Sequence, residues 1–276
     1  MKAAPFAYVR PATLDDAVAE LVRSRGEGKV LAGGQSLVPI LAMRLARPST
    51  VVDISALSEL DYVRREGDQL VIGALVRQRT LEQHSLTAAV PLLRLALPWI
   101  GHRELRSRGT VCGSIAHADP AAELPAVACC LNAQLEIAGQ RGRRTVTAAE
   151  FFHGAMATAV GPEDVLAAVR FPVARPGDGF GFAEIARRHG DFALAGVATR
   201  AHAGGKTVLT AFGVSDRPVT RDVTGLDDEA LAALARDLVD TAGDPHGSRE
   251  YRQRLVAALA VREVARARRA AEGGPA

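Results

Sequence analysis

The sequence has few cysteines, namely Cys112, Cys129 and Cys130 in 276 residues. They form no CxxC pair, and no histidine stands near them at metal-ligand spacing. An iron–sulfur cluster takes four cysteine ligands and a structural zinc takes four Cys or His ligands. We therefore predict three reduced thiols and no metal ligand in this chain, and we expect any metal chemistry to lie on a partner.

The net charge is also small, and the sequence has no long apolar run. The chain has 34 Lys and Arg against 31 Asp and Glu, a net charge of +3 that is too small to predict nucleic acid binding. No run reaches the roughly 18 apolar residues that a membrane span requires, and no signal peptide is evident. We expect a cytoplasmic protein. Its 48% hydrophobic content supports a sizeable core, and its length fits two domains.

The first part of the chain alternates helical and strand periodicity. Thr13 is predicted to cap an amphipathic helix, because Asp16 follows three residues later. Short apolar runs at 29–31 and 50–54 predict strands. Two further segments alternate around a glycine turn and predict a hairpin, at 134–138 and 144–147.

A linker is predicted at 173–179, where VARPGDG combines two glycines with a proline. Residues 1–175 are therefore assigned to a first domain and residues 176–276 to a second, α+β domain. The final GGPA is expected to fray. Three strands and two helices are predicted after the linker, at 180–188, 192–202, 206–214, 227–240 and 248–269.

The first of two glycine-containing segments is LAGGQSL at 31–37, between a strand and a helical pattern. Gly33 and Gly34 can take positive φ and let backbone amides approach a phosphate, and Ser36 adds a hydroxyl. The segment matches neither GxGxxG nor GxxxxGK[ST]. It predicts another kind of phosphate site, and a plain strand-to-helix turn is the alternative.

The second segment is TVCGS at 110–114, within an irregular stretch at 101–125. We predict that it is a loop, because glycine, proline and polar residues interrupt the periodicity, and loops of this length are commonly functional or disordered. It offers hydroxyls and amides around Gly113. Two such loops can enclose one pyrophosphate without a lysine or a helix dipole.

Four blocks of the sequence resemble a known family over nearly the whole chain. They are AGGQSL at 32–37, TVCGSIAHADPAAELP at 110–125, GFAEIARRHGDFALAGVA at 181–198 and SREYRQRLVAALAVRE at 248–263. The chain resembles the FAD-binding medium subunit of the molybdenum hydroxylases, which include xanthine dehydrogenase and aerobic carbon monoxide dehydrogenase. The resemblance implies an α+β fold, with an FAD-binding domain of the p-cresol methylhydroxylase and vanillyl-alcohol oxidase type built from two α/β subdomains. A smaller α+β domain of the carbon monoxide dehydrogenase flavoprotein type follows, with a three-stranded antiparallel sheet and helices.

The resemblance also implies a set of FAD-binding residues. The two glycine-containing segments would hold the pyrophosphate, Glu123 would lie near the ribose or adenine, and Phe182 would lie near the isoalloxazine ring unless it is a core residue. No catalytic residue is predicted, because the flavin supplies the chemistry. The full set is Leu31, Ala32, Gly33, Gly34, Gln35, Ser36, Leu37, Ile100, Thr110, Val111, Cys112, Gly113, Ser114, Glu123, Leu166 and Phe182.

Two positions need separate interpretation. Cys112 stands where the family usually has glycine, in the pattern TxGGS. If that position requires positive φ, the Cβ costs about 1–2 kcal/mol, but the amide remains and FAD binding is expected to survive. His117 and Asp119 suit either a general base or a turn before Pro120, and the turn is favoured.

The implied function is that of the FAD-carrying subunit of a heterotrimer, arranged as a dimer of heterotrimers. A large subunit would carry the molybdenum cofactor, a small subunit two [2Fe-2S] clusters, and FAD would pass electrons to NAD, a quinone or oxygen. Purines, N-heterocycles, aldehydes, carbon monoxide and aromatic thioesters remain open as substrates. The alternatives are a stand-alone flavin oxidase or dehydrogenase and an assembly subunit without FAD.

Overall fold

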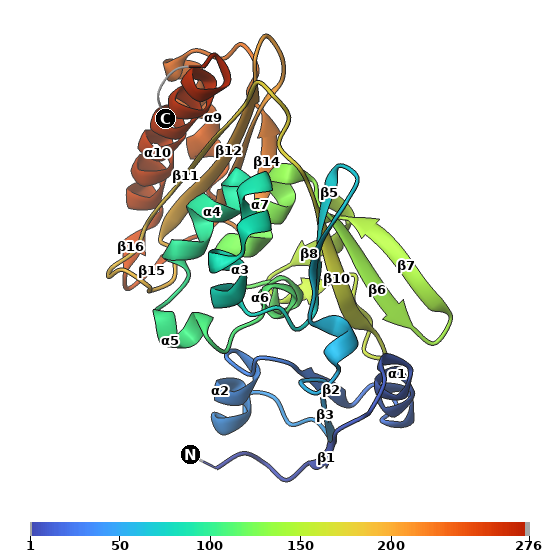
Figure 1. Cartoon of the computed structure of the whole chain (residues 1–276). Coiled ribbons are helices and arrows are strands. Elements are labelled where there is room, and N and C mark those ends of the chain that lie inside the picture. The colour runs from blue at the N-terminus through green and yellow to red at the C-terminus, as the bar shows by residue number, and fades with distance from the viewer. Residues whose placement is uncertain (1, 274–276) are drawn as a thin grey trace.

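The computed structural model describes residues 2–273, which form three principal sheets along the chain (Figure 1). The first sheet is parallel and has β3 (Thr50–Asp53) between β1 (Ala7–Val9) and β2 (Gly28–Leu31). Helix α1 (Leu14–Arg23) packs against it. The Thr13 hydroxyl accepts a hydrogen bond from the Asp16 amide at 3.1 Å, so the predicted helix cap is confirmed.

The second sheet is antiparallel, with strand order β4-β5-β10-β6-β7. The predicted hairpin is confirmed as β6 and β7. The strands are β4 (Val63–Glu66), β5 (Gln69–Gly73), β6 (Gln134–Gly139), β7 (Gly142–Thr147) and β10 (Val165–Pro172). The helices of this part of the chain are α2 (Leu37–Ala42), α3 (Gln78–Gln83), α4 (Pro91–Ala96), α5 (Arg103–Arg106), α6 (Val111–His117), α7 (Glu123–Leu131) and α8 (Ala148–Phe151), and β8 (Phe152–Gly154) pairs with β9 (Ala157–Thr158).

The third sheet has four antiparallel strands, which corrects the prediction of three. The additional strand, β14 (Val219–Asp222), pairs with β13 at the edge of the sheet and follows Pro218. Its side chains are partly or fully exposed, so it carries no apolar periodicity, as is common for short edge strands. The other elements of this region are β11 (Asp178–Ile185), β12 (Ala195–His202), β13 (Thr207–Phe212), α9 (Asp228–Asp237), α10 (Arg249–Ala271) and the short pair β15 (Gly243–Asp244) and β16 (Gly247–Ser248).

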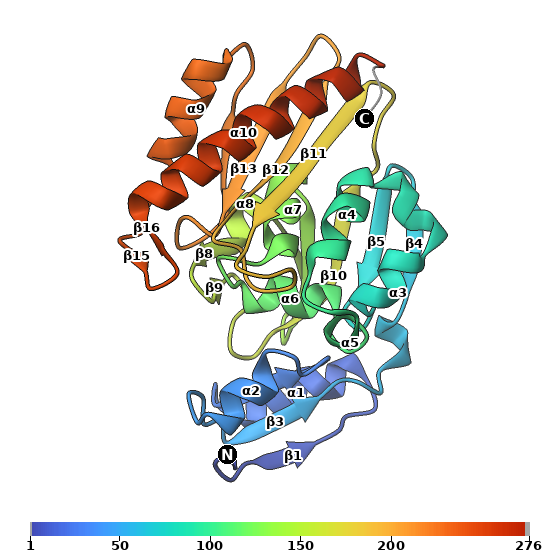
Figure 2. The same ribbon diagram turned by 90° about the vertical axis from the view of Figure 1, so that its left-hand side faces the viewer.

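The third sheet is covered on both faces. Helix α10 lies across β11 and β12 on one side, as Figure 2 shows, and α4 and α7 contact the opposite side. Phe180 and Phe182 of β11 belong to the same apolar cluster as Leu92 and Leu93 of α4. The core is therefore continuous between the segments before and after the 173–179 linker.

Helix α10 approaches β11 so closely that only glycine fits at the contact. A Cβ added at Gly179 would overlap the backbone at Ala267 and Ala271. We expect Gly179→Val to lower the free energy of unfolding by about 2 kcal/mol or more, because the helix must move away. Thermal denaturation of the full chain measures this effect. In the matched control Gly205→Val, the new Cβ makes only ordinary contacts, so an equal loss in both variants would contradict the assignment.

No helix within residues 2–273 is both long and apolar enough to cross a membrane. The expected fraying of the final GGPA concerns mainly residues 274–276, which lie outside the described residues.

Candidate cofactor site

The Gly33–Gly34 segment follows β2 at the end of the parallel sheet and leads directly into α2. Gly34 has a φ of +76°, a conformation that glycine adopts without strain. Within residues 2–273, the backbone amides of Gly33, Gly34, Gln35 and Ser36 donate no hydrogen bond. Four successive free amides around a positive-φ residue suit an anion such as phosphate.

The segment at 110–114 is not a loop, which corrects the prediction made for it. Thr110 is the N-cap of α6, and its hydroxyl accepts a hydrogen bond from the Gly113 amide at 3.0 Å. The remaining predicted residues of the segment form the first turns of that helix. Glycine and serine are weak helix formers, but burial of Val111 and Ile115 stabilises this short helix. The stretch at 101–125 likewise contains α5 and the start of α7.

Gly33 of the first segment packs against the residues that directly precede the second segment. A Cβ at Gly33 would overlap the Arg108 carbonyl oxygen and lie 3.0 Å from the Gly109 Cα. The backbone before α6 is held by two hydrogen bonds, from the Val111 amide to Val76 O at 3.0 Å and from the Gln78 amide to Gly109 O at 2.9 Å. The structure therefore brings together the two segments that the sequence singled out.

Several residues beside this junction were missed by the sequence analysis. Asp53 ends β3 next to Leu31, and its carboxylate accepts hydrogen bonds from the Tyr8 hydroxyl at 2.5 Å and the Ser55 amide at 2.9 Å. Burial raises the pKa of Asp53, but these hydrogen bonds lower it more, so its net pKa lies below the usual value. Arg77 also reaches the junction. These residues are far apart in sequence and match no motif, so spacing alone gave no signal.

Cys112 is buried in α6 and has a negative φ. Its Sγ lies 3.7 Å from the Ile72 carbonyl oxygen, and burial raises the pKa of the thiol far above its ordinary value. The position therefore does not require glycine in this chain. The strain considered from the sequence is absent, and the thiol is a packing group.

We expect Cys112→Gly to leave the FAD content unchanged and to lower stability by about 1–2 kcal/mol. Glycine weakens the helix and leaves a small cavity in place of the thiol. The FAD-to-protein absorbance ratio and the melting temperature test the two parts of this expectation. A rise in melting temperature would show that Cys112 is strained after all.

Glu123 is the first residue of α7 and is only 5% exposed. Burial raises its pKa to about 7, and the negative charge of Asp119 contributes. Glu184 of β11, which the sequence analysis missed, is 6% exposed, and its Oε2 has no hydrogen-bond partner in the described structure. Burial and the nearby Glu123 raise the pKa of Glu184 to about 9. The two carboxyl groups thus form a buried pair between α7 and the third sheet.

The three predicted apolar positions, Ile100, Leu166 and Phe182, all lie in the main core cluster. Phe182 stacks on Phe212 with ring centroids 5.7 Å apart, which favours its interpretation as a core residue. All three side chains are therefore buried in the core of the protein.

The connection between β11 and β12 packs against the segment around Ile100. His189 stacks on Trp99 with ring centroids 5.9 Å apart, and Gly190 lies against Gly101. Phe192 was predicted to begin a strand, but it lies in this connection and is 64% exposed. The connection therefore presents an aromatic side chain at the surface.

His117 and Asp119 are arranged as a turn. The Asp119 carboxylate accepts a hydrogen bond from the Ala121 amide at 2.9 Å, and Ala118 between the two has a φ of +52°. The favoured interpretation, a turn before Pro120, is confirmed.

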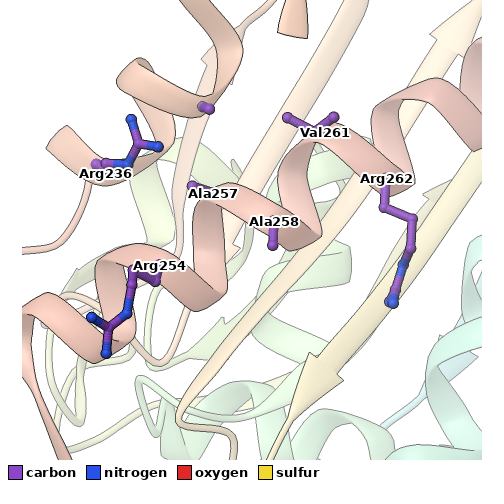
Figure 3. A pocket seen from close by; sticks show the side chains of 7 residues that line it. Arg236, Arg254, Ala257, Ala258, Val261 and Arg262 are labelled. Atoms are coloured by element: carbon purple, nitrogen blue, oxygen red, sulfur yellow. The ribbon is translucent and has the colours of Figure 1, made fainter. Parts of the chain in front are cut away.

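A surface hollow lies between α9 and α10 and contains none of the predicted site residues (Figure 3). Figures 1 and 2 place these helices at the opposite end of the molecule from β2 and α2, which flank the Gly33–Gly34 segment. The hollow is therefore separate from the candidate site. It is lined by Ala232, Arg236, Arg254, Ala257, Ala258, Val261 and Arg262.

Comparison with known proteins assigns the family. Residues 4–174 match the family described as the FAD binding domain in molybdopterin dehydrogenase. The chain belongs to the FAD-binding medium subunits of the molybdenum hydroxylases. It is therefore an FAD-binding subunit of an oxidoreductase, as the resemblance implied.

Individual members of this family are similar over their whole length. The beta subunit of caffeine dehydrogenase from Pseudomonas sp. strain CBB1 is 35% identical, with 97% of this chain and 96% of the relative aligned. The carbon monoxide dehydrogenase medium chain of Afipia carboxidovorans is 36% identical, with 95% and 96% aligned. The structure of carbon monoxide dehydrogenase from Hydrogenophaga pseudoflava superimposes with a TM-score of 0.92 at 30% identity and covers 97% of this chain and 98% of that chain. The mixed helix and strand architecture is thus shared with these medium chains.

Proposed function

We propose that the pyrophosphate of FAD binds where the Gly33–Gly34 segment meets the start of α6. The observation that carries this proposal is the contact of Gly33 with the Arg108 carbonyl, together with the free amides of residues 33–36. These amides are donors for phosphate oxygens. Ser36 and Ser114 flank the junction with hydroxyl groups, and Thr110 fixes the start of α6 by capping it.

The rest of the predicted set surrounds the remainder of the cofactor in this proposal. Glu123 lies toward the ribose or adenine, and Ile100 and Leu166 form the apolar wall. The FAD-binding domain is of the p-cresol methylhydroxylase type with two α/β subdomains, and it ends at residue 175. The family match over 4–174 and the turn-rich linker support this division.

Bound FAD supplies reversible electron transfer, so the protein has to hold and orient the cofactor and shield it from water. The buried Ile100 and Leu166 exclude water on the apolar side. The connection around His189 and Phe192 closes against the Ile100 segment through the stacked Trp99. No acid or base of this chain is required for substrate chemistry.

We further propose that the chain works within a heteromeric complex, as a dimer of heterotrimers. A large subunit would carry the molybdenum cofactor, and a small subunit would carry [2Fe-2S] clusters and deliver electrons to the FAD. The acceptor would be NAD, a quinone or oxygen. The relatives support this proposal, because they are named as medium chains or subunits of dehydrogenases. A stand-alone flavin oxidase is the second candidate, but no observation favours it.

The cofactor and the partners can be tested in one preparation from the native host. Acid release followed by chromatography is expected to yield FAD, because a site with two phosphate-binding segments suits a dinucleotide. FMN, or no flavin from a folded chain, would contradict the site. Two co-purifying subunits that contain molybdenum and iron are expected, and a flavin-containing chain that purifies alone and oxidises a substrate would favour the stand-alone oxidase.

A further inference from the structure

Arg77 stands at the junction of the two proposed phosphate-binding segments. It lies between β5 and α3, and its backbone forms a bridge with Thr110. Its guanidinium donates a hydrogen bond to the Arg108 carbonyl oxygen. Gly33 packs against this same carbonyl oxygen. The Arg77 side chain therefore fixes the Arg108 carbonyl group. This carbonyl supports Gly33 of the first segment, and Arg108 stands just before the second segment.

The charge of Arg77 is not balanced by a close carboxylate. Among residues 2–273, no carboxylate oxygen lies within 4.0 Å of its guanidinium, and the side chain is half-buried. Burial lowers the pKa of Arg77, the positive charge of Arg108 lowers it further, and Asp61 and Asp53 oppose this only in part. A cation that is partly removed from water beside a second cation is stabilised when an anion binds next to it.

We propose that Arg77 is a positioning residue for the cofactor, one that joins the two segments and supplies positive charge to the FAD pyrophosphate. This inference rests on the proposed function. It changes the expectation that amides and hydroxyls alone neutralise the phosphates. The side chain acts through the Arg108 carbonyl on the geometry of the Gly33 segment, and through its charge on the affinity for the anion.

Substitutions at Arg77 separate these two contributions in the full-length apo-chain. Arg77→Gln keeps a hydrogen-bond donor without the charge, and Arg77→Lys keeps the charge without the planar fork. We expect Arg77→Gln to raise the Kd for FAD about 10- to 100-fold, the range for loss of a charged hydrogen bond. Arg77→Lys should have a smaller effect. The Kd of Arg77→Gln should also depend less on salt concentration, because one positive charge near the phosphates is lost.

Three ligands localise the effect within the cofactor. Affinity for ADP, which contains a pyrophosphate but no flavin, should fall by the same factor as affinity for FAD. Affinity for riboflavin, which has no phosphate, should not change. The control is Arg65→Gln, because the Arg65 Nε also donates to a backbone carbonyl, that of Gly67 at 3.0 Å, but on an exposed turn.

The outcomes of these measurements separate a failure of the proposed function from a failure of the role proposed for Arg77. If the wild-type chain binds neither FAD nor ADP, the proposed function is wrong and this inference falls with it. If the wild type binds both and Arg77→Gln changes the Kd for FAD, ADP and riboflavin equally, or changes only the melting temperature of the apo-chain, Arg77 has a folding role and the inference is overturned. Selective loss of FAD and ADP affinity with unchanged riboflavin affinity supports it.

Discussion

Gly33→Ala is expected to abolish FAD binding while the chain still folds. The new Cβ would overlap the Arg108 carbonyl oxygen, and a backbone atom cannot rotate away as a side chain does. The Gly33 segment or the start of α6 must therefore move, and the amides that would hold the pyrophosphate lose their arrangement. Because alanine accepts the negative φ of Gly33, the expected loss comes from the contact and not from backbone strain.

The measurement is the ratio of flavin to protein absorbance, with circular dichroism as the test of folding. Gly67→Ala is the matched control, because Gly67 has a φ of +61° but an added Cβ there meets nothing within 4 Å. It should cost about 1 kcal/mol of stability through backbone strain and leave the FAD content unchanged. Gly34→Val should lower the FAD content as well, because it combines positive φ with a contact to Val38. A Gly33→Ala chain with full flavin content would show that the segments do not form one site.

The sequence was sufficient to single out the two glycine-containing segments, but it was not sufficient to predict their geometry. The segment at 31–37 has the strand-to-helix setting that its pattern predicted. The segment at 110–114 is helical because buried contacts of Val111 and Ile115 outweigh weak local propensity. The contact between Gly33 and Arg108 joins positions far apart in the chain, so no local pattern reports it.

The third sheet illustrates the same limit. Strands with buried apolar residues, such as β12, were predicted, whereas the exposed edge strand β14 was not. Phe182 is apolar whether it faces a flavin or the core, and only its stack on Phe212 separates these roles. Glu184 looks like an ordinary surface carboxylate in sequence, because its burial depends on helices α4 and α7 packing over the third sheet.

Glu184→Gln is expected to stabilise the protein at alkaline pH, and the sign follows from its raised pKa. The Glu184 carboxyl has a pKa of about 9 in the folded chain, against an ordinary value of 4.5 for a glutamate in water. Between these values the unfolded chain has released a proton that the folded chain still holds. Unfolding therefore becomes easier as pH rises through this window, by up to about 1.4 kcal/mol for each pH unit. Glutamine carries no charge at any of these pH values, so this dependence disappears in the variant.

Melting temperatures of wild type and variant, measured from about pH 5 to about pH 9, test the expectation. The two curves should nearly meet at the acid end and separate steadily toward the alkaline end, with the variant higher. Glu123 has a pKa of about 7 and titrates in the same window, so the variant keeps a smaller slope from this second carboxyl.

Glu150→Gln serves as a contrast, because hydrogen bonds from Thr147 lower the pKa of Glu150. Its carboxylate stabilises the fold once ionised, and its loss should lower the melting temperature near neutral pH. If Glu184→Gln instead runs parallel to wild type over the whole range, Glu184 is ionised in the folded chain and the buried carboxyl pair does not hold a proton.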